Sequence, residues 1–203
     1  IHGLGQNSKD WDTIKNELET RGISSVAPDL FDLAKGRKLD YPTVYQAFSE
    51  LCESYQDKLN LCGLSLGGLL ALNYAIQYPK KINSLVLIGT PFEIPKGLLK
   101  FQNIVFRFMP KAVFQNMGVS KKDFIRLSKS MVDLNFMDSA TALDCPALIL
   151  CGAKDKTNME SAKRFHEAMK NSKLVIVEAS GHEVNKDNPN ELVRVLQDFW
   201  ADR

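Results

Sequence analysis

Residues 63–67 (Gly-Leu-Ser-Leu-Gly) constrain this chain more than any other feature of its sequence. They follow an apolar run, 59–62, that is typical of the end of a strand, and they precede a run that is apolar nearly all round up to Tyr78. The glycines on either side of Ser65 let a strand and a helix approach closely, because glycine has no Cβ. The spacing predicts a tight strand-to-helix turn that exposes the Ser65 hydroxyl as a nucleophile. A glycine-rich turn with an idle serine is the alternative.

Apolar runs alternate with helical patterns along most of the chain. Such runs predict strands buried on both faces, and the helices between them predict a mostly parallel sheet with helices on both faces. The predicted strands are 23–28, 59–62, 82–89, 147–152 and 174–177, and the predicted helices lie around 11–18, 43–55, 66–78, 162–169 and 188–199. With 203 residues and 44% hydrophobic content, the chain fits a single α/β domain, 1–203, with a sizeable core.

Residues 92–142 interrupt this alternation. They contain no convincing strand, and they are far longer than an ordinary connection between two sheet strands. We interpret the segment as a helical lid inserted in the domain, covering an apolar pocket beside Ser65. Phe106, Phe108 and Met109 are the lid residues that we expect to contact substrate. Packing of the insertion onto the core is the simpler reading, and the two readings are compatible.

Three histidines are available as the base that a serine nucleophile requires. His166 lies in a helical pattern beside Glu167 and is expected to face solvent, while His2 is expected to shape a loop. His182 follows the last apolar strand, on a loop at the strand's carboxyl end. Functional sites of open parallel sheets assemble at that edge. We therefore predict that His182 is the general base.

Asp155 is the predicted acid that orients His182. It comes just after the apolar run 147–152, so it lies at the same edge of the predicted sheet and within reach of a histidine on the neighbouring strand. Asp29 and Asp138 are alternatives, although Asp29 precedes the serine turn and is expected to shape its own loop. The chain order serine, aspartate, histidine is the one expected for this kind of turn.

Two backbone amides are predicted to bind the oxyanion that forms when the serine attacks. The N–H of Leu66 directly follows the nucleophile, and the N–H of Leu4 lies in the loop 2–5 (His-Gly-Leu-Gly). Glycines on both sides of Leu4 permit the bend that the loop needs, and Gly3 is expected to lie against the substrate. A plain glycine-rich connector is the alternative reading of this loop.

These features together resemble the α/β-hydrolase fold superfamily. The resemblance rests on the serine turn at 63–67, the loop at 2–5, the Gly-x-x-Asp at 152–155 and the Ser-Gly-His at 180–182. It runs along essentially the whole chain. It is closest to the cofactor-free, lidded, carboxylesterase-like branch, which includes the pimeloyl-carrier-protein methyl esterase of biotin synthesis.

The resemblance implies hydrolysis through an acyl-enzyme by a triad of Ser65, Asp155 and His182, with no cofactor and no metal. One departure concerns the start of the sheet. Ile1 looks like the last residue of a strand, and the two antiparallel strands that usually precede the His-Gly loop are missing from this sequence. We therefore expect a smaller or trimmed sheet and an unaltered site.

Cysteine spacing and hydropathy bear on metal binding, on the redox compartment and on membrane insertion. The four cysteines, Cys52, Cys62, Cys145 and Cys151, have no C-x-x-C spacing, and no histidine stands at ligand spacing to them. Free thiols in a reducing, cytoplasmic compartment are the expectation. No apolar run reaches the length of a membrane span.

The charge is unevenly placed, although the formal net charge is only +2. Eight basic and two acidic residues lie between 92 and 130, which gives that segment +6 and leaves −4 for the rest. A solvated helix face is one reading. An anionic partner is the other: an acidic carrier protein, an acyl substrate with a carboxylate or phosphate, or a lipid surface. Nucleic acid is not expected, because no basic groove studded with aromatic residues is evident.

The sequence thus predicts a serine hydrolase that acts on an ester or thioester with an apolar acyl part, as a monomer or weak dimer. A carbon–carbon bond hydrolase or lyase would use the same triad. A small-molecule sensor that keeps the triad but has little turnover is an alternative from another class.

Overall fold

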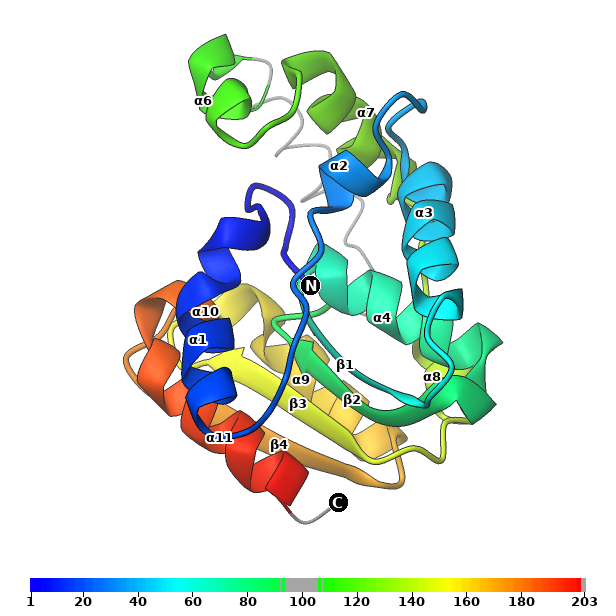
Figure 1. The fold of residues 1–203 in the computed structure, drawn as a ribbon, viewed down its shortest axis with the longest axis vertical. Coiled ribbons are helices and arrows are strands. Elements are labelled where there is room, and N and C mark those ends of the chain that lie inside the picture. Colours follow the sequence, from blue (N-terminus) through cyan, green and yellow to red (C-terminus); the bar gives the residue numbers. More distant parts are fainter. Residues whose placement is uncertain (92, 94–105, 107, 202–203) are drawn as a thin grey trace.

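The computed structural model describes residues 1–91, 93, 106 and 108–201, and the following statements concern these residues. They form a four-stranded sheet in the order β1 (Leu59–Leu64), β2 (Ile82–Ile88), β3 (Ala147–Gly152) and β4 (Ser172–Val177), as Figure 1 shows. Every neighbouring pair is parallel. All four carboxyl ends therefore lie at one edge, and the predicted fold class is confirmed.

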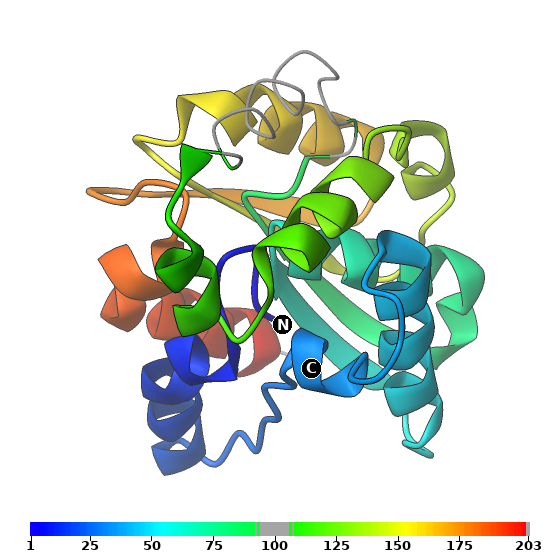
Figure 2. The same cartoon turned by 90° about the horizontal axis from the view of Figure 1, so that it is seen from above.

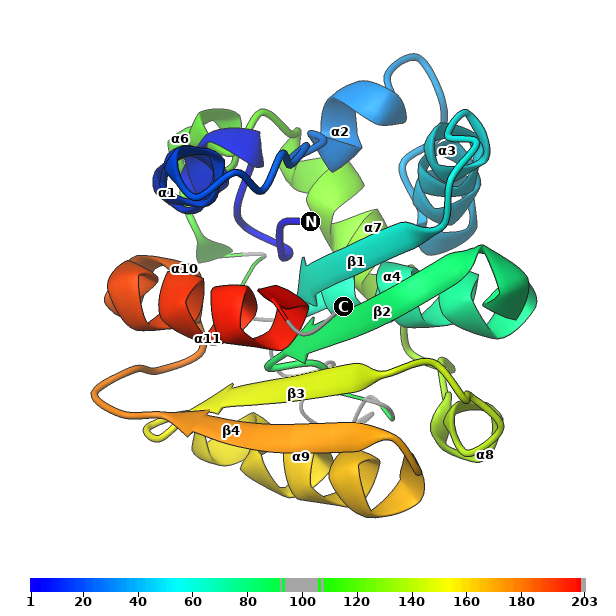
Figure 3. The ribbon, with the colours of Figure 1, turned by 60° about the horizontal axis from the view of Figure 1, so that its bottom comes forward.

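Helices cover both faces of this sheet (Figure 3). The helices α3 (Tyr41–Glu53), α4 (Leu66–Gln77) and α9 (Lys156–Ala168) share a core with one face, and α1 (Asp12–Thr20) and α11 (Pro189–Ala201) share a core with the other. Successive side chains of β2 point alternately into these two cores. Leu85 and Leu87 pack in the core with α3, α4 and α9, and Val86 and Ile88 pack in the core with α1 and α11. Both faces of each inner strand are buried, which explains the continuous apolar runs.

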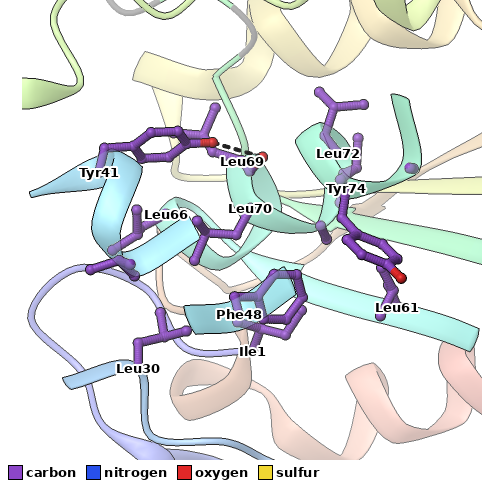
Figure 4. Packing of buried hydrophobic residues seen from close by; sticks show 14 of the residues in the cluster. Ile1, Leu30, Tyr41, Phe48, Leu61, Leu66, Leu69, Leu70, Leu72 and Tyr74 are labelled. Carbon is purple, nitrogen blue, oxygen red and sulfur yellow. Dashed lines mark hydrogen bonds between the residues drawn. The ribbon is translucent and has the colours of Figure 1, made fainter. Parts of the chain in front are cut away.

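The helix that follows the serine is buried on most of its surface. Leu66, Leu69, Leu70 and Leu72 are each 0% exposed. Figure 4 shows these side chains packed among residues of α3, β1 and the N-terminal loop. A helix enclosed in this way holds the serine turn rigidly against the sheet.

Shorter elements complete the described fold. They are η1 (Ser8–Trp11), α2 (Leu30–Leu33), η2 (Pro79–Lys81), α6 (Lys111–Asn116), α7 (Lys121–Ser130), α8 (Met137–Ala140) and α10 (Val184–Asp187). The last long helix begins as predicted, because the side chain of Asn188 accepts a hydrogen bond from the N–H of Glu191 at 3.3 Å.

The predicted strand at 23–28 is wrong, since this segment has no strand pairing. Residues 22–28 and 59–62 line the same cavity of about 550 Å³. A space therefore lies between the segment and β1, and a strand requires a hydrogen-bonded partner. Ile1 does reach this edge of β1: its nitrogen donates to the carbonyl of Cys62 at 2.7 Å, and its carbonyl accepts from the N–H of Leu64 at 3.1 Å.

The described part of the segment 92–142 is helical, with α6, α7 and α8. In Figures 1 and 2, α6 and α7 lie over the side of the molecule that carries the N-terminal loop. Residues 92, 94–105 and 107 of the predicted lid lie outside the described residues. The division into one domain with a lid stays a prediction.

Candidate active site

Ser65 occupies the turn between β1 and α4 in a backbone conformation that side chains rarely adopt. Its φ is 52° and its ψ is −110°. The turn is held on both sides: the N–H of Ser65 donates to the carbonyl of Ile88 at 2.9 Å, and the carbonyl of Ser65 accepts from the N–H of Leu69 at 2.9 Å. Such strain persists only where the surrounding structure imposes it, and it is typical of functional sites.

The glycines around Ser65 are required by contacts between backbones. A Cβ on Gly63 would overlap the backbone of Gly67 and lie 2.5 Å from the nitrogen of Gly68. A Cβ on Gly67 would lie 2.7 Å from the carbonyl oxygen of His2 and closer still to that of Ile1. The prediction of a close approach between strand and helix is confirmed at Gly63, whereas Gly67 allows the helix to approach the N-terminal loop instead.

His182 and Asp155 meet at the carboxyl edge of the sheet. Nδ1 of His182 lies 2.7 Å from Oδ2 of Asp155. The Asp155 side chain is only 5% exposed, whereas that of His182 is 41% exposed and accessible to a reactant. Asp155 follows β3 and His182 follows β4, so two adjacent parallel strands bring them together, as the sequence predicts.

The carboxylate of Asp155 is kept ionised. Burial disfavours its charge, but hydrogen bonds from His182 and Asn158 outweigh this effect and lower the pKa of Asp155 below its ordinary value. An ionised carboxylate only accepts hydrogen bonds. Nδ1 of His182 must therefore carry the proton in the neutral ring, which leaves the Nε2 lone pair available as a base.

Ser65 and His182 approach the same point of the sheet, the end of β2. Ser65 is hydrogen-bonded to Ile88, and a Cβ on the next residue, Gly89, would lie 3.0 Å from Nδ1 of His182 and 3.3 Å from Oδ2 of Asp155. The φ of Gly89 is 49°, which glycine adopts without strain. No hydrogen bond joins Ser65 to His182 in the described part of the chain. Such bonds are often long before substrate binds.

The N-terminal loop lies directly against the serine turn. A Cβ on Gly3 would lie 3.5 Å from the Cβ of Ser65. The N–H of Leu66 is at the first position of α4, where no carbonyl one turn back can accept it. Within the described residues, no hydrogen bond engages the N–H of Leu66 or of Leu4. Neither amide therefore has to give up a partner before it can bind an anion.

His2 shapes this loop rather than serving as the base. It is 0% exposed, and its Nε2 accepts a hydrogen bond from the N–H of Leu30 at 2.9 Å. Burial lowers the pKa of His2, so the ring is neutral. Nδ1 then donates to the carbonyl of Gly3, 2.9 Å away. The loop is thereby tied to the start of α2.

Sequence reasoning missed a second support of the loop, Gln6. This residue is 1% exposed, and its Nε2 donates to Glu183 at 2.9 Å and to Oδ1 of Asn185 at 3.1 Å. The side chain therefore links the loop after His2 to the segment after His182. The partners are 177 and 179 residues away, and no local pattern could have indicated them.

The alternative candidates for the acid and the base have other surroundings. Asp29 accepts hydrogen bonds from the N–H groups of Phe31 at 3.0 Å and Asp32 at 3.1 Å, so it caps α2 and shapes its own loop. Asp138 is exposed on α8. His166 is exposed on α9, with its Nδ1 2.9 Å from the hydroxyl of Ser172.

The three lid residues predicted to contact substrate lie in different surroundings. Phe108 is 84% exposed. Phe106 packs edge-on against Phe124, with ring centroids 5.0 Å apart, and Met109 is partly buried against the core. The 550 Å³ cavity beside β1 is lined by none of these residues and not by Ser65. Contact between the lid and a substrate stays a prediction.

Three further findings concern the described residues alone. No group of three or more histidine, cysteine or acidic side chains could hold a metal ion. No described helix has both the length and the apolar character needed to cross a membrane. All four cysteines are free.

Comparison with known proteins agrees with this fold. Residues 1–133 match the alpha/beta hydrolase fold family. Lipase 3 of Moraxella sp. (strain TA144) is 26% identical over 94% of this chain and 74% of its own. The 2-hydroxy-6-oxo-2,4-heptadienoate hydrolase of Pseudomonas putida is 25% identical over 99% of this chain and 87% of its own. A thermophilic esterase from Thermogutta terrifontis has a similar structure, with a TM-score of 0.78 and 18% identity over 99% of this chain and 88% of its own. This chain belongs to the α/β hydrolase fold family.

Proposed function

We propose that this protein is a serine hydrolase that cleaves a carboxylic ester or thioester with an apolar acyl part. The observation that supports this most directly is the hydrogen-bonded Asp155–His182 pair beside a serine in a strained turn. A lipase among the relatives and an esterase among the similar structures favour ester substrates.

Ser65 attacks the carbonyl carbon of the substrate, and Nε2 of His182 takes the hydroxyl proton as the bond forms. Asp155 holds the ring through Nδ1–H and stabilises the imidazolium. His182 then gives its proton to the departing alcohol or thiol, leaving an acyl group on Ser65. Water, activated by the same histidine, releases the acid and restores the serine.

The N–H groups of Leu4 and Leu66 bind the oxyanion in both tetrahedral intermediates. The Leu66 amide also lies at the positive end of the α4 helix dipole, which favours negative charge there. Neither amide has to leave a partner among the described residues, so little reorganisation accompanies the reaction. Glycine at position 3 lets the loop lie next to Ser65, since a Cβ there would lie 3.2 Å from Cδ2 and 3.3 Å from the carbonyl oxygen of Leu64.

The test is Ser65→Ala, assayed with p-nitrophenyl esters of increasing acyl length. We expect kcat to fall by about 10⁴–10⁶-fold, because members of a triad act as a unit. Ser24→Ala, at an exposed position outside the site, is the matched control and should keep full activity. A fluorophosphonate probe should label the wild type and the control but not Ser65→Ala. Hydrolysis that survives the loss of Ser65 would refute the proposal.

Carbon–carbon bond hydrolysis is a second candidate, which the Pseudomonas putida relative favours. The same triad would serve it. Parallel assays with esters, thioesters and a 2-hydroxy-6-oxo-2,4-dienoic acid distinguish the two, because only one class should give efficient turnover. Tight ligand binding with almost no turnover of any substrate would instead indicate a sensor.

The basic character of the segment 92–130 supports a finer proposal, that the substrate is anionic or is presented by an acidic carrier protein. Two described basic residues are engaged within the segment: Arg126 pairs with Asp123 at 2.6 Å, and Lys121 donates to the carbonyl of Met109 at 2.7 Å. The remaining described ones are Lys111, Lys122 and Lys129. Added salt should then lower kcat/KM more for a carboxylate-bearing ester than for a neutral one.

A further inference from the structure

Asn158 turns its side chain back onto the carboxylate of Asp155. It lies on the first turn of α9, three residues after Asp155, and is 9% exposed. Its Nδ2 is 3.0 Å from Oδ1 and 2.9 Å from Oδ2 of Asp155. The same nitrogen is 3.2 Å from Nδ1 of His182. One amide group therefore touches both members of the acid–base pair.

The orientation of this amide follows from its neighbours. With Nδ2 toward Asp155, the amide faces both carboxylate oxygens with a donor, whereas the flipped amide would place an oxygen against them. The contact with His182 joins two nitrogens that both carry protons when Nδ1 is protonated, so it is not a hydrogen bond in that state. The amide therefore donates to the carboxylate of Asp155. This contact favours the ionised form of Asp155, whose oxygens only accept hydrogen bonds.

Helix capping alone does not explain why residue 158 is an asparagine that turns back onto Asp155. Asp155 is already the N-cap of α9, because its Oδ1 accepts from the backbone N–H of Asn158 at 3.2 Å. The first turn of a helix favours acidic residues, so the helix itself would be served at least as well by aspartate at this position. A second carboxylate there would, however, face both Asp155 and His182.

We propose that Asn158 is a positioning residue that holds Asp155 ionised and aimed at Nδ1 of His182, so that Nε2 stays free to receive the Ser65 proton. The proposal rests on the function proposed above for these three residues. The amide supplies a hydrogen-bond donor and no charge. It satisfies carboxylate oxygens that burial would otherwise leave short of partners, without adding a second negative charge beside the imidazole.

Other ionisable groups near this pair do not take over the role. The buried thiol of Cys151 lies 3.7 Å from the carbonyl of Asp155, and burial raises its pKa to about 12, so it is uncharged. Glu183, next to His182, pairs with Lys186 at 3.2 Å and accepts from Gln6. Lys154 and Lys156, on either side of Asp155, are exposed.

The decisive variant is Asn158→Asp, which keeps the shape and suits the helix start. We expect the acid limb of the kcat/KM profile to move to higher pH by about one unit, because a second carboxylate favours the imidazolium. At pH values well below the acid limb, kcat/KM should fall by about tenfold, and it should recover at higher pH, with KM little changed. Asn190→Asp, at an exposed position on the first turn of α11, is the matched control and should leave the profile unmoved.

NMR of the His182 ring gives a readout that needs no substrate, and only three histidines have to be assigned. The ring titration should move upward in Asn158→Asp and not in Asn190→Asp. Asn158→Ala covers the case in which the Asn158→Asp protein does not fold. In this second variant kcat should fall about tenfold through the lost hydrogen bonds, with KM unchanged.

Asn158→Asp and Asn190→Asp proteins with superimposable titrations and pH profiles would overturn the proposal, as would full activity in Asn158→Ala. Failure of the proposed function gives a different pattern. In that case Ser65→Ala stays active, while the ring titration still reports whether Asn158 governs the Asp155–His182 pair.

Discussion

The close approach of α4 to the N-terminal loop makes Gly67→Ala an informative substitution. Alanine in place of glycine inside a helix ordinarily stabilises a protein by about 1 kcal/mol. Here the added Cβ would lie 2.7 Å from the carbonyl oxygen of His2 and 2.8 Å from the carbonyl carbon of Ile1, whereas ordinary contact begins at 3.4 Å. The atoms are backbone, so no side-chain rotation relieves the overlap. The loop must retreat by several tenths of an ångström.

The anchoring of His2 sets the size of the effect. Its ring is fully buried and is hydrogen-bonded to Leu30, so movement of the loop disturbs packed neighbours. Overpacking of this kind costs about 1–3 kcal/mol. Less the gain of about 1 kcal/mol expected from alanine in a helix, the net loss is up to about 2 kcal/mol, and at about 2–4 °C for each kcal/mol Tm should fall by up to roughly 8 °C. Displacement of the Leu4 amide from the oxyanion should lower kcat about 100-fold.

Gly68→Ala provides the comparison, because its Cβ would press on a side chain. It would lie 3.0 Å from Cβ and Cγ2 of Thr90 and closer to Oγ1. Thr90→Ala removes the hydroxyl and the methyl group, so the double variant should regain most of the stability that Gly68→Ala loses. The same Thr90→Ala change should not rescue Gly67→Ala. Thermal unfolding and steady-state hydrolysis measure both effects. A Gly67→Ala protein that is as stable and as active as the wild type would refute the argument from close approach.

Two further predictions concern charge and the loop support. The pKa of Asp155 is lowered in the folded protein, so its ionised form contributes stability that is present above about pH 4 and is lost as the pH falls further. The difference in unfolding free energy between wild type and Asp155→Asn, measured in urea, should therefore be larger at pH 7 than at pH 3; an equal difference at both would contradict the assignment. Gln6→Met keeps the side-chain volume but removes the donors to Glu183 and Asn185, so kcat should fall about tenfold and stability by about 1–3 kcal/mol. Unchanged kinetics in Gln6→Met would show that the loop does not need this support.

Much of the fold could be predicted because its causes are local in the sequence. Continuous apolar runs indicate strands buried on both faces, and all four strands of the described sheet were predicted in this way. The strand at 23–28 was predicted from the same kind of pattern and was wrong. A strand depends on a partner, and this segment is separated from β1 by a cavity.

Ser65, His182 and Asp155 could be proposed from the sequence because a short motif and the polarity of a parallel sheet place them at one edge. Asn158 and Gln6 could not. Their positions in the sequence look like ordinary helix and loop residues, and their roles depend on which way a side chain turns and on partners up to 179 residues away.

The sequence by itself determined the alternation of strands and helices and the tight turn at Ser65, since both follow from spacing within a few residues. Only the tertiary structure decided that Asp155 is buried where it meets His182, that the loop at Gly3 lies beside the serine, and that the side chain of Asn158 contacts both members of the pair. The physical reason is the distance along the chain over which each effect acts. Hydrophobic periodicity and glycine act on neighbouring residues, whereas a hydrogen bond of 2.7 Å depends on how distant segments pack.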